Sequence, residues 1–317
     1  MSERGVGVPE VGEFGLIDRV TARLSYGSTV LLGPGDDAAV VAAPDTRVVA
    51  STDVLVEGRH FRRDWSTAWD VGHRAAAANL ADVAAMGARP TALLVALCMP
   101  PDLTTGWAED LADGLGAEAA TVGASVVGGD MSASPTLTIA VTALGDLAGR
   151  APVTRSGARP GDVVALAGRT GYAAAGLTVL SRGFRTPRLL VEAYRRPEVP
   201  YAAGPTAAVA GATAMIDVSD GLVADLGHVA RASGVAVDLS RDAFEVPRQM
   251  GDVAQALGVD PYTWLLAGGD DHALVATFPP AVPLPVGWRP IGAAATGSGV
   301  TVDGHPWEGP AGWDHFR

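Results

Sequence analysis

The sequence predicts a mixed α+β protein built from two domains. The chain has 317 residues, 48% of them hydrophobic, which is enough for two domains of about 150 residues each. Its apolar patterns switch between helical and strand periods without a regular βαβ series, so a doubly wound sheet is disfavoured. Gly, Pro and Arg collect at residues 147–161, as is typical of a linker. We therefore expect one domain over residues 1–146 and a second over residues 147–317.

The first half supplies three predicted helices and four predicted strands. Thr104 or Thr105 can cap a helix that Gly123 stops, and Pro100-Pro101 ends the strand before it. The predicted helices cover residues 13–24, 68–87 and 104–122. The predicted strands cover residues 48–56, 91–99, 124–127 and 136–144.

The second half repeats this mixture of helices and strands. The predicted strands cover residues 162–167, 214–218, 235–239 and 273–278. The predicted helices cover residues 171–180, 206–213, 222–233 and 248–257. Gly234 is placed to stop the third of these helices. Residues 187–205 contain several prolines and arginines and no clear period, so we expect an irregular segment there.

Charge and composition exclude several classes of protein. The formal net charge is −12, and nucleic-acid binders need clustered cations, so no nucleic-acid partner is expected. A nucleotide ligand is still compatible, because magnesium can neutralise phosphates and carboxylates together. All 23 basic residues are arginine. The absence of lysine excludes a Walker-A lysine, a kinase strand lysine and a Schiff-base lysine.

The chain carries no signal for secretion or membrane insertion. Residues 1–10 lack an apolar signal core, and no run approaches the roughly 20 apolar residues that span a bilayer. The single cysteine, Cys98, allows no disulfide within the chain and no Cys/His zinc pattern. We expect a cytoplasmic protein without a membrane partner.

Acidic residues recur beside small residues at predicted turns and strand ends. They are Asp36 and Asp37 after Gly35, Asp53 after Ser51-Thr52, Asp130 after Gly128-Gly129, Asp217 with Asp220 around Ser219, and Asp82 within a predicted helix. Each alone is compatible with ordinary turn chemistry or a solvated helix face. Together, Asp with Ser and Thr form an oxygen-only ligand set, which suits magnesium rather than zinc.

Glycine and arginine complete a predicted phosphate site. Gly129 lets backbone amides approach a phosphate closely, because a glycine has no side chain in the way. Without lysine, an arginine must complete any phosphate clamp. Arg155, in its Gly/Pro-rich loop, is the best-placed candidate.

These motifs closely resemble those of the thiamine-monophosphate kinase family over essentially the whole chain. The matching segments are Gly35-Asp36-Asp37-Ala38-Ala39, Ser51-Thr52-Asp53, Glu57-Gly58-Arg59-His60-Phe61, Asn79-Leu80-Ala81-Asp82-Val83-Ala84-Ala85-Met86-Gly87-Ala88, Gly128-Gly129-Asp130, Arg155-Ser156-Gly157-Ala158, Asp217-Val218-Ser219-Asp220-Gly221 and Gly312-Trp313-Asp314-His315-Phe316. Parts of the pattern occur across a wider superfamily that includes aminoimidazole ribonucleotide synthetase. The resemblance implies that two-domain fold and a homodimer formed through strands of the N-terminal domain.

The resemblance also implies an activity and a set of site residues. The activity is magnesium-assisted transfer of the ATP γ-phosphoryl group to thiamine monophosphate, giving thiamine diphosphate as the last step of its biosynthesis. Asp53, Asp130 and Asp220 would be catalytic, and Gly129, Asp130, Arg155 and Ser219 would bind ATP. Several magnesium ions would be held by Asp37, Ser51, Thr52, Asp53, Asp82, Asp130, Asp217 and Asp220. The family correspondence favours Asp37 over Asp36.

Substrate contacts are implied at His60, Asp270 and Trp313. His60 could instead simply end a strand, and Trp313 could be a core anchor. Where the family usually carries Gly-Gly-Glu-Asp-Tyr-Glu-Leu, this chain has Gly268-Gly269-Asp270-Asp271-His272-Ala273-Leu274. The expected glutamate is therefore shortened to Asp270, which predicts a slightly altered substrate pocket.

Two other functions are compatible with the same motifs. One is another ATP-dependent enzyme of the superfamily, similar to aminoimidazole ribonucleotide synthetase or selenophosphate synthetase. The latter is disfavoured because no reactive cysteine precedes the acidic loop. The other is a non-catalytic maturation scaffold, which would have no need to retain so many acidic residues.

Overall fold

The chain folds into two compact units, each with its own sheet. The computed structural model describes residues 8–33, 39–310 and 312. The first unit comprises residues 1–83 and 89–149, and the second comprises residues 84–88 and 150–317. Residues 84–88, at the end of a helix, thus group with the second unit rather than with their sequence neighbours. The predicted mixed α+β class is confirmed. No described helix is both long enough and apolar enough to cross a membrane.

The first unit is organised around a four-stranded sheet. Its strands are β3 (Val49–Val56), β4 (Arg89–Met99), β5 (Ser125–Ala133) and β6 (Thr138–Asp146). Their order is β3-β6-β4-β5, with β4 and β5 parallel and the other neighbours antiparallel. A separate antiparallel pair is formed by β1 (Val30–Leu32) and β2 (Val40–Val41). Strands β3 and β5 are therefore the two edges of the larger sheet.

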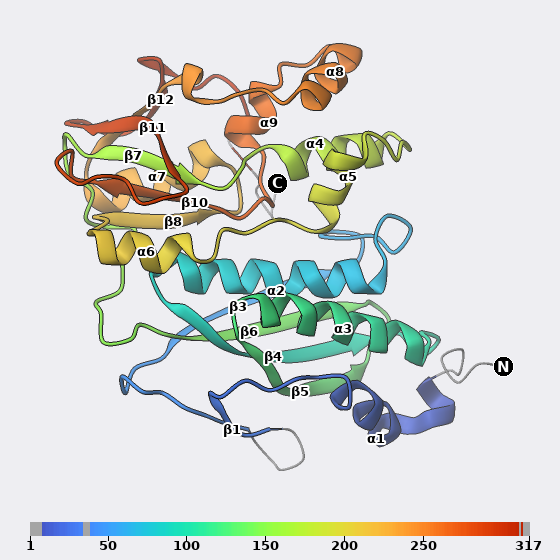
Figure 1. Ribbon diagram of the computed structural model, residues 1–317. Coiled ribbons are helices and arrows are strands. Elements are labelled where there is room, and N and C mark those ends of the chain that lie inside the picture. The colour runs from blue at the N-terminus through green and yellow to red at the C-terminus, as the bar shows by residue number, and fades with distance from the viewer. Residues whose placement is uncertain (1–7, 34–38, 311, 313–317) are drawn as a thin grey trace. The chain divides into compact units, whose positions relative to one another are not determined.

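The two faces of this sheet differ in burial. Along β6, Ile139, Val141 and Ala143 are fully buried, whereas Thr138, Ala140, Thr142 and Leu144 between them are half-buried. Successive side chains of a strand point to opposite faces, so one face is covered and the other is partly open. Helices α2 (Ala68–Ala85) and α3 (Thr105–Thr121) lie on one side of the sheet (Figure 1).

Glycines allow α2 and α3 to pack closely. A Cβ atom on Gly72 would lie 2.1 Å from the Leu111 carbonyl oxygen, and one on Gly114 would lie 2.1 Å from the Trp69 carbonyl oxygen. Neither position can carry a side chain without separating the two helices. This close packing fixes α2, which carries two of the polar residues described below.

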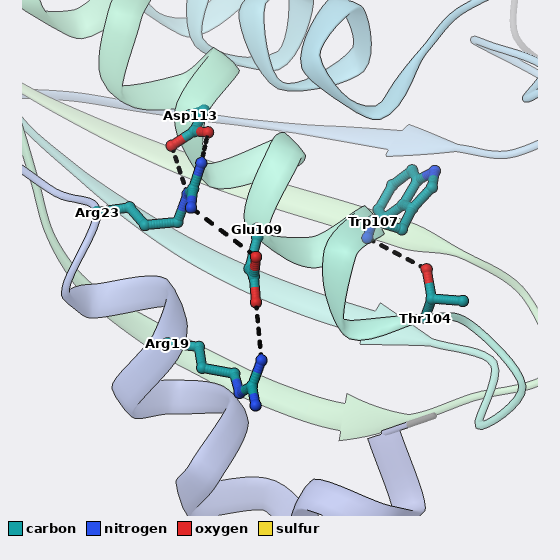
Figure 2. Close-up of polar contacts among 6 residues, drawn as sticks. All are labelled: Arg19, Arg23, Thr104, Trp107, Glu109 and Asp113. Atoms are coloured by element: carbon teal, nitrogen blue, oxygen red, sulfur yellow. Dashed lines mark hydrogen bonds and ion pairs between the residues drawn. The ribbon is translucent and has the colours of Figure 1, made fainter. Parts of the chain in front are cut away.

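Helix α1 (Val8–Thr21) is joined to α3 by ion pairs (Figure 2). Arg19 Nη1 lies 3.4 Å from Glu109 Oε1, and Arg23, in the turn after α1, pairs with both Glu109 and Asp113. Thr104 caps α3 by accepting a hydrogen bond from the Trp107 amide, as its sequence position predicts. Helix α1 begins five residues earlier than the predicted start at residue 13.

The second unit contains a seven-stranded sheet of order β13-β12-β9-β11-β7-β10-β8. The strands are β7 (Val163–Ala167), β8 (Ala214–Val218), β9 (Ala236–Leu239), β10 (Ala273–Phe278), β11 (Trp288–Ala295), β12 (Gly299–Val302) and β13 (His305–Pro306). All neighbours are antiparallel except β9 and β12. Every residue of strands β8 and β10 is buried, which explains why both sequences are mostly apolar, with Asp217 and Thr277 as the exceptions.

Helices surround this second sheet (Figure 1). They are α4 (Tyr172–Ser181), α5 (Arg188–Arg195), α6 (Ala203–Ala210), α7 (Leu222–Ser233), the 3₁₀ turn η2 (Arg241–Ala243), α8 (Arg248–Leu257) and α9 (Tyr262–Ala267). Leu166, Ile216 and Leu226 belong to one buried cluster, and Met215, Leu274 and Phe278 to another. The two clusters are formed by alternate residues of the same strands, so both faces of the sheet are packed.

The structure differs from the sequence-based expectations at several points. The segment 187–205, predicted to be irregular, contains α5 and the start of α6. No strand was predicted after residue 278, where the structure has β11 to β13. A register shift between Pro290 and Gly292 accommodates the proline in β11. Gly128-Gly129-Asp130 was expected to form a turn but lies within β5. Asp53 lies inside β3, as the predicted strand over residues 48–56 requires, and not at a strand end.

Candidate active site

One group of predicted residues lies along the edge strand β3, facing α2. Ser51 Oγ donates a 2.6 Å hydrogen bond to Asp82 Oδ2. The Asp53 amide donates a 3.0 Å hydrogen bond to Asn79 Oδ1. This amide lies on the outer side of the edge strand β3, where no described strand pairs with it. Asn79 is fully buried and anchored to its own helix through the Ala75 carbonyl. Ser51, Asp53 and Asp82 are thus held together by two elements.

Thr52 and Asp130 lie on the other face of the sheet. The β3–β6–β4–β5 registers place Val54, Ala140, Ala96 and Asp130 in one row, which shares a face with Thr52 and not with Asp53. The Thr52 hydroxyl donates to the Val141 carbonyl at 3.0 Å. Asp130 is exposed on the edge strand β5 and accepts a long hydrogen bond from Ser132.

Asp53 and Asp130 do not converge on one cation within this sheet. They lie on opposite edges, three strand spacings apart, or roughly 14 Å at about 4.8 Å per strand. Within the described ranges, no three His, Cys, Asp or Glu side chains form a metal-binding group. Of the predicted ligands that the structure describes in this unit, Ser51, Asp53 and Asp82 lie together, and Thr52 and Asp130 lie on the other face.

Gly129 has a packing role of its own. A Cβ atom at this position would lie 1.8 Å from the Val95 carbonyl oxygen on the neighbouring strand. The parallel strands β4 and β5 can therefore approach each other only because residue 129 is glycine. This requirement explains the glycine without reference to any phosphate.

His60 stabilises the turn after β3. Its Nδ1 accepts a 2.9 Å hydrogen bond from the Val56 amide, which assigns the proton of the neutral ring to Nε2. Phe61, the next residue, is 1% exposed and anchors the segment. The local role that the sequence left open for His60, ending a strand, is present in the structure.

In the second unit, two loops containing predicted site residues pack together. The Asp270 amide donates a 2.9 Å hydrogen bond to the Ser219 carbonyl. Added Cβ atoms would lie 2.0 Å from Ser219 O at Gly269 and 2.6 Å from Ala267 O at Gly221. Both glycines are required by this close approach. The structure therefore brings Ser219, Asp220 and Asp270 into one loop pair.

Asp217 lies at the buried end of β8, next to His272. The two residues are 5% and 6% exposed, and His272 Nδ1 lies 3.2 Å from Asp217 Oδ2. Leu274 is the partner of Asp217 in the β8–β10 register, so His272 approaches from just before β10 begins. Asp217 is the most deeply buried of the predicted metal ligands that the structure describes.

Asp225 holds the loop that carries Asp220. Its Oδ2 accepts hydrogen bonds from the Asp220 amide at 3.1 Å and the Gly221 amide at 3.0 Å. Burial, followed by the nearby Asp217 and Asp220 carboxylates, raises the pKa of Asp225 to about 7. Asp225 is therefore a third acidic group beside Asp217 and Asp220, and it holds the backbone at the start of α7.

Asp271 is a second buried acid, at the start of α4. Its Oδ1 accepts a 3.1 Å hydrogen bond from the Ala173 amide, and its Oδ2 has no hydrogen-bond partner among the described residues. Burial raises the pKa of Asp271 to about 7, against the lowering effects of the Ala173 amide and Arg169. Asp271 lies between Asp270 and His272 in the chain.

The loop of Arg155 is tied to the end of α7. Ser233 Oγ donates to the Arg155 carbonyl at 3.1 Å and accepts from the amides of residues 157–158. The Arg155 side chain is exposed. Burial, then the charges of Arg231 and Arg155, lowers the pKa of His228, so the Arg155 guanidinium lies near this helix. An exposed guanidinium on an anchored loop is suited to an anionic ligand.

Two predicted residues, Asp37 and Trp313, lie outside the described residues, as does Asp36. Gly312, just before Trp313, is described. A Cβ atom there would lie 2.7 Å from the Ala224 Cβ and 2.9 Å from the Asp220 carbonyl oxygen. The backbone at Gly312 therefore packs against the loop of Asp220.

Sequence reasoning did not assign Asn79, Asp225 or His272. Asn79 lies one helical turn before Asp82, so the i, i+3 spacing placed it on the same face. Asp225 lies in the first turn of the helix that follows Ser-Asp-Gly. An acid at such a position can accept hydrogen bonds from the backbone amides that have no partner within the helix, and this was the available signal. No local signal identified His272, whose partner Asp217 is 55 residues away.

The two units offer different chemistry. The first presents exposed carboxylates on its edge strands, at Asp53 and Asp130. The second combines the buried carboxylates of Asp217, Asp225 and Asp271 with the half-buried Asp220 and Asp270 on loops fixed by glycines. All these donors are oxygens apart from His60 and His272, which suits a hard divalent cation and the phosphates it carries.

The comparisons with known proteins agree with these features. Residues 35–147 match the family model for the N-terminal domain of AIR synthase related proteins. The thiamine-monophosphate kinase of Mycobacterium tuberculosis is 50% identical over 309 residues, which cover 97% of this chain and 92% of the relative.

Solved structures with the same fold cover nearly the whole chain. The thiamine-monophosphate kinase of Stenotrophomonas maltophilia K279a has a TM-score of 0.80 at 33% identity, covering 93% of this chain and 97% of the other. A structure described as AaThiL complexed with AMPPCP and TMP has a TM-score of 0.79 at 33% identity, covering 98% and 99%. The fold implied by the sequence motifs is confirmed. With half of its residues identical to a relative along almost its full length, the chain belongs to the thiamine-monophosphate kinase family.

Proposed function

We propose that this chain phosphorylates thiamine monophosphate with ATP, giving thiamine diphosphate and ADP. The observation that carries the proposal is family membership along 97% of the chain. An ATP analogue and TMP are the ligands named for a structural relative. The acceptor oxygen belongs to a phosphate that is already ionised near neutral pH, so the reaction requires no general base.

Magnesium fits the donor set of the chain. Carboxylates and hydroxyls are the ligands that this cation prefers, and the 2.6 Å contact between Ser51 and Asp82 holds two of them together. In our proposal the ligands are Asp37, Ser51, Thr52, Asp53, Asp82, Asp130, Asp217 and Asp220. Thr52 is the weakest member, because its hydroxyl is directed to β6. When bound, magnesium supplies positive charge between two anionic reactants.

The remaining roles follow the sequence motifs. Asp53, Asp130 and Asp220 act in catalysis through the cations and phosphates they hold. Gly129, Asp130, Arg155 and Ser219 bind ATP, and the exposed guanidinium of Arg155 is the cationic member of this group. His60, Asp270 and Trp313 contact thiamine monophosphate. In the described part of the chain, the Gly312 backbone packs against the loop of Asp220.

The test is a direct assay of the reaction. Purified protein is incubated with magnesium, ATP and thiamine monophosphate, and thiamine diphosphate is measured by chromatography. We expect stoichiometric formation of thiamine diphosphate and ADP. The acceptor substrates of the two other superfamily enzymes serve as alternatives. ATP turnover with either of these and none with thiamine monophosphate would overturn the proposal.

We also propose that two copies associate through the open face of the first unit's sheet. Val54 and Leu94 lie on this face and are 47% and 38% exposed. A mostly apolar cavity of about 750 Å³ adjoins the same face at Asp130 and Thr142. Apolar side chains gathered on a strand face favour burial against a partner. Light scattering should give a dimer for the parent and a folded monomer for Val54→Arg. A dimeric Val54→Arg variant would exclude this face.

A cytoplasmic location belongs to the same proposal. The three ligands it requires, ATP, magnesium and thiamine monophosphate, are charged and membrane-impermeant. Fractionation of cells producing the full chain should place thiamine diphosphate synthesis in the soluble cytoplasmic fraction.

A further inference from the structure

The contact between His272 and Asp217 involves a strained backbone. His272 has φ = +51° and Asp270 has φ = +68°, both in the left-handed region that non-glycine residues seldom occupy. Two backbone hydrogen bonds hold the segment: the His272 amide to the Val218 carbonyl at 3.1 Å, and the Asp270 amide to the Ser219 carbonyl at 2.9 Å. Such strain persists only where surrounding structure fixes it, and it is often found at functional sites.

The strained segment brings the imidazole to a buried carboxylate. Asp217 Oδ2 lies 3.2 Å from His272 Nδ1, and His272 is the only described side chain with a hydrogen bond to this carboxylate. An ionised carboxylate can only accept, so the contact requires a proton on Nδ1. This hydrogen bond restricts the rotation of the Asp217 side chain.

The contact also differs from the family pattern described for the sequence. The family usually carries tyrosine where this chain has His272, and a tyrosine has no donor at the position of Nδ1. Neighbouring Asp271 does not replace this donor, because its Oδ1 accepts from Ala173 instead.

We propose that His272 is a positioning residue, which holds one oxygen of Asp217 through Nδ1 so that the carboxylate meets a divalent cation in a single orientation. The inference rests on the proposed function, in which Asp217 is a magnesium ligand. Partners that orient ligating side chains commonly change metal affinity by roughly 10- to 100-fold when removed. A purely structural histidine would leave metal affinity unchanged once folding is accounted for.

The experiment compares three substitutions at residue 272. His272→Asn keeps an N–H donor at the position of Nδ1, His272→Gln moves the donor to the position of Nε2, and His272→Leu removes it. Protein-bound Mn²⁺ is measured by water-proton relaxation in the presence of the ATP analogue AMPPCP. Thermal unfolding of each variant serves as the folding control.

We expect His272→Asn to retain Mn²⁺ affinity within about threefold, and His272→Gln and His272→Leu to weaken it roughly 10- to 100-fold. The Asn and Gln variants both carry an amide donor and differ by one methylene group, which shifts the donor. Because Asn also adopts a left-handed backbone more readily than Gln, the two affinities are compared after the unfolding control, and this pair decides the matter if His272→Leu does not fold. Equal affinity in all folded variants, equal weakening in Asn and Gln, or no protein-bound Mn²⁺ in the parent would overturn the inference.

The two proposals can fail separately. If the parent forms thiamine diphosphate but the Asn and Gln variants bind Mn²⁺ alike, the positioning role fails and the proposed function stands. If the parent forms no thiamine diphosphate but the Asn and Gln variants differ as expected, the kinase proposal fails. The positioning of Asp217 would then serve another cation-dependent reaction.

Discussion

The two units hold their acidic residues in contrasting environments. In the first unit, Asp53 and Asp130 are exposed on the edge strands of a sheet. In the second, Asp217, Asp225 and Asp271 are buried, at 5%, 2% and 2% exposure. Exposed carboxylates stay hydrated, whereas buried ones need hydrogen bonds or protonation. Substitution of an exposed acid of the first unit should therefore affect function alone. Substitution of a buried acid of the second unit should affect folding as well.

The largest expected effect is on catalysis in the first unit. Asp53→Asn removes a charge from an exposed strand position without changing its shape. If cations on this carboxylate stabilise the transferring phosphoryl group, turnover should fall by at least about 1000-fold. Formation of thiamine diphosphate measures this loss, and circular dichroism checks that the variant is folded. Turnover at the parent rate would show that the metal site has been misplaced.

Next in size is a folding effect in the second unit. Gly269→Ala places a Cβ atom 2.0 Å from the Ser219 carbonyl oxygen, which cannot move without separating the two loops. The free energy of unfolding should fall by about 3 kcal/mol, as in other overpacked positions. Gly227→Ala in α7 is the matched control, because no atom lies within 4 Å of its Cβ. The Gly227→Ala variant should be stabilised by up to about 1 kcal/mol. If urea unfolding gives the same change in free energy for Gly227→Ala and Gly269→Ala, the close packing at Gly269 is contradicted.

Asp271 should make the stability of the second unit depend on pH. Its folded pKa of about 7 exceeds the ordinary value of 3.8, so the folded chain prefers the protonated acid. Its contribution to stability is complete below about pH 4 and is lost as the pH rises to 7. Asp271→Asn cannot ionise and should avoid this loss. Between pH 5 and pH 8, its unfolding free energy should gain about 3 kcal/mol relative to the parent.

The control for this experiment is Asp252→Asn, whose side chain is 66% exposed. Urea unfolding at both pH values should show no comparable gain for this variant. If Asp271→Asn and the parent lose stability in parallel, Asp271 is not the group that titrates.

The smallest expected effect distinguishes two neighbouring hydroxyls of the first unit. Ser51→Ala removes the hydrogen bond to Asp82, which is worth about 1 kcal/mol. The magnesium concentration for half-maximal turnover should therefore rise about fivefold. Thr52→Val should change it less, because that hydroxyl is directed to β6. A larger effect from Thr52→Val would assign the ligand role to the other face of the sheet.

The sequence by itself determined the fold class, the family and the residue types of the site. Local patterns were sufficient for α3, α7 and β8, because their caps, stops and apolar periods lie within each segment. The motif around Asp53 and the Asn79-to-Ala88 segment identified the family, since both are contiguous in the chain.

Only the tertiary structure decided which site residues meet. Strand register places Asp53 and Asp130 on opposite faces of one sheet, and a shift by one residue would reverse this. The burial of Asp271 and the contact between His272 and Asp217 likewise depend on loop packing around Gly269. Such contacts join residues far apart in the chain, and no local pattern of residues determines their distance or burial.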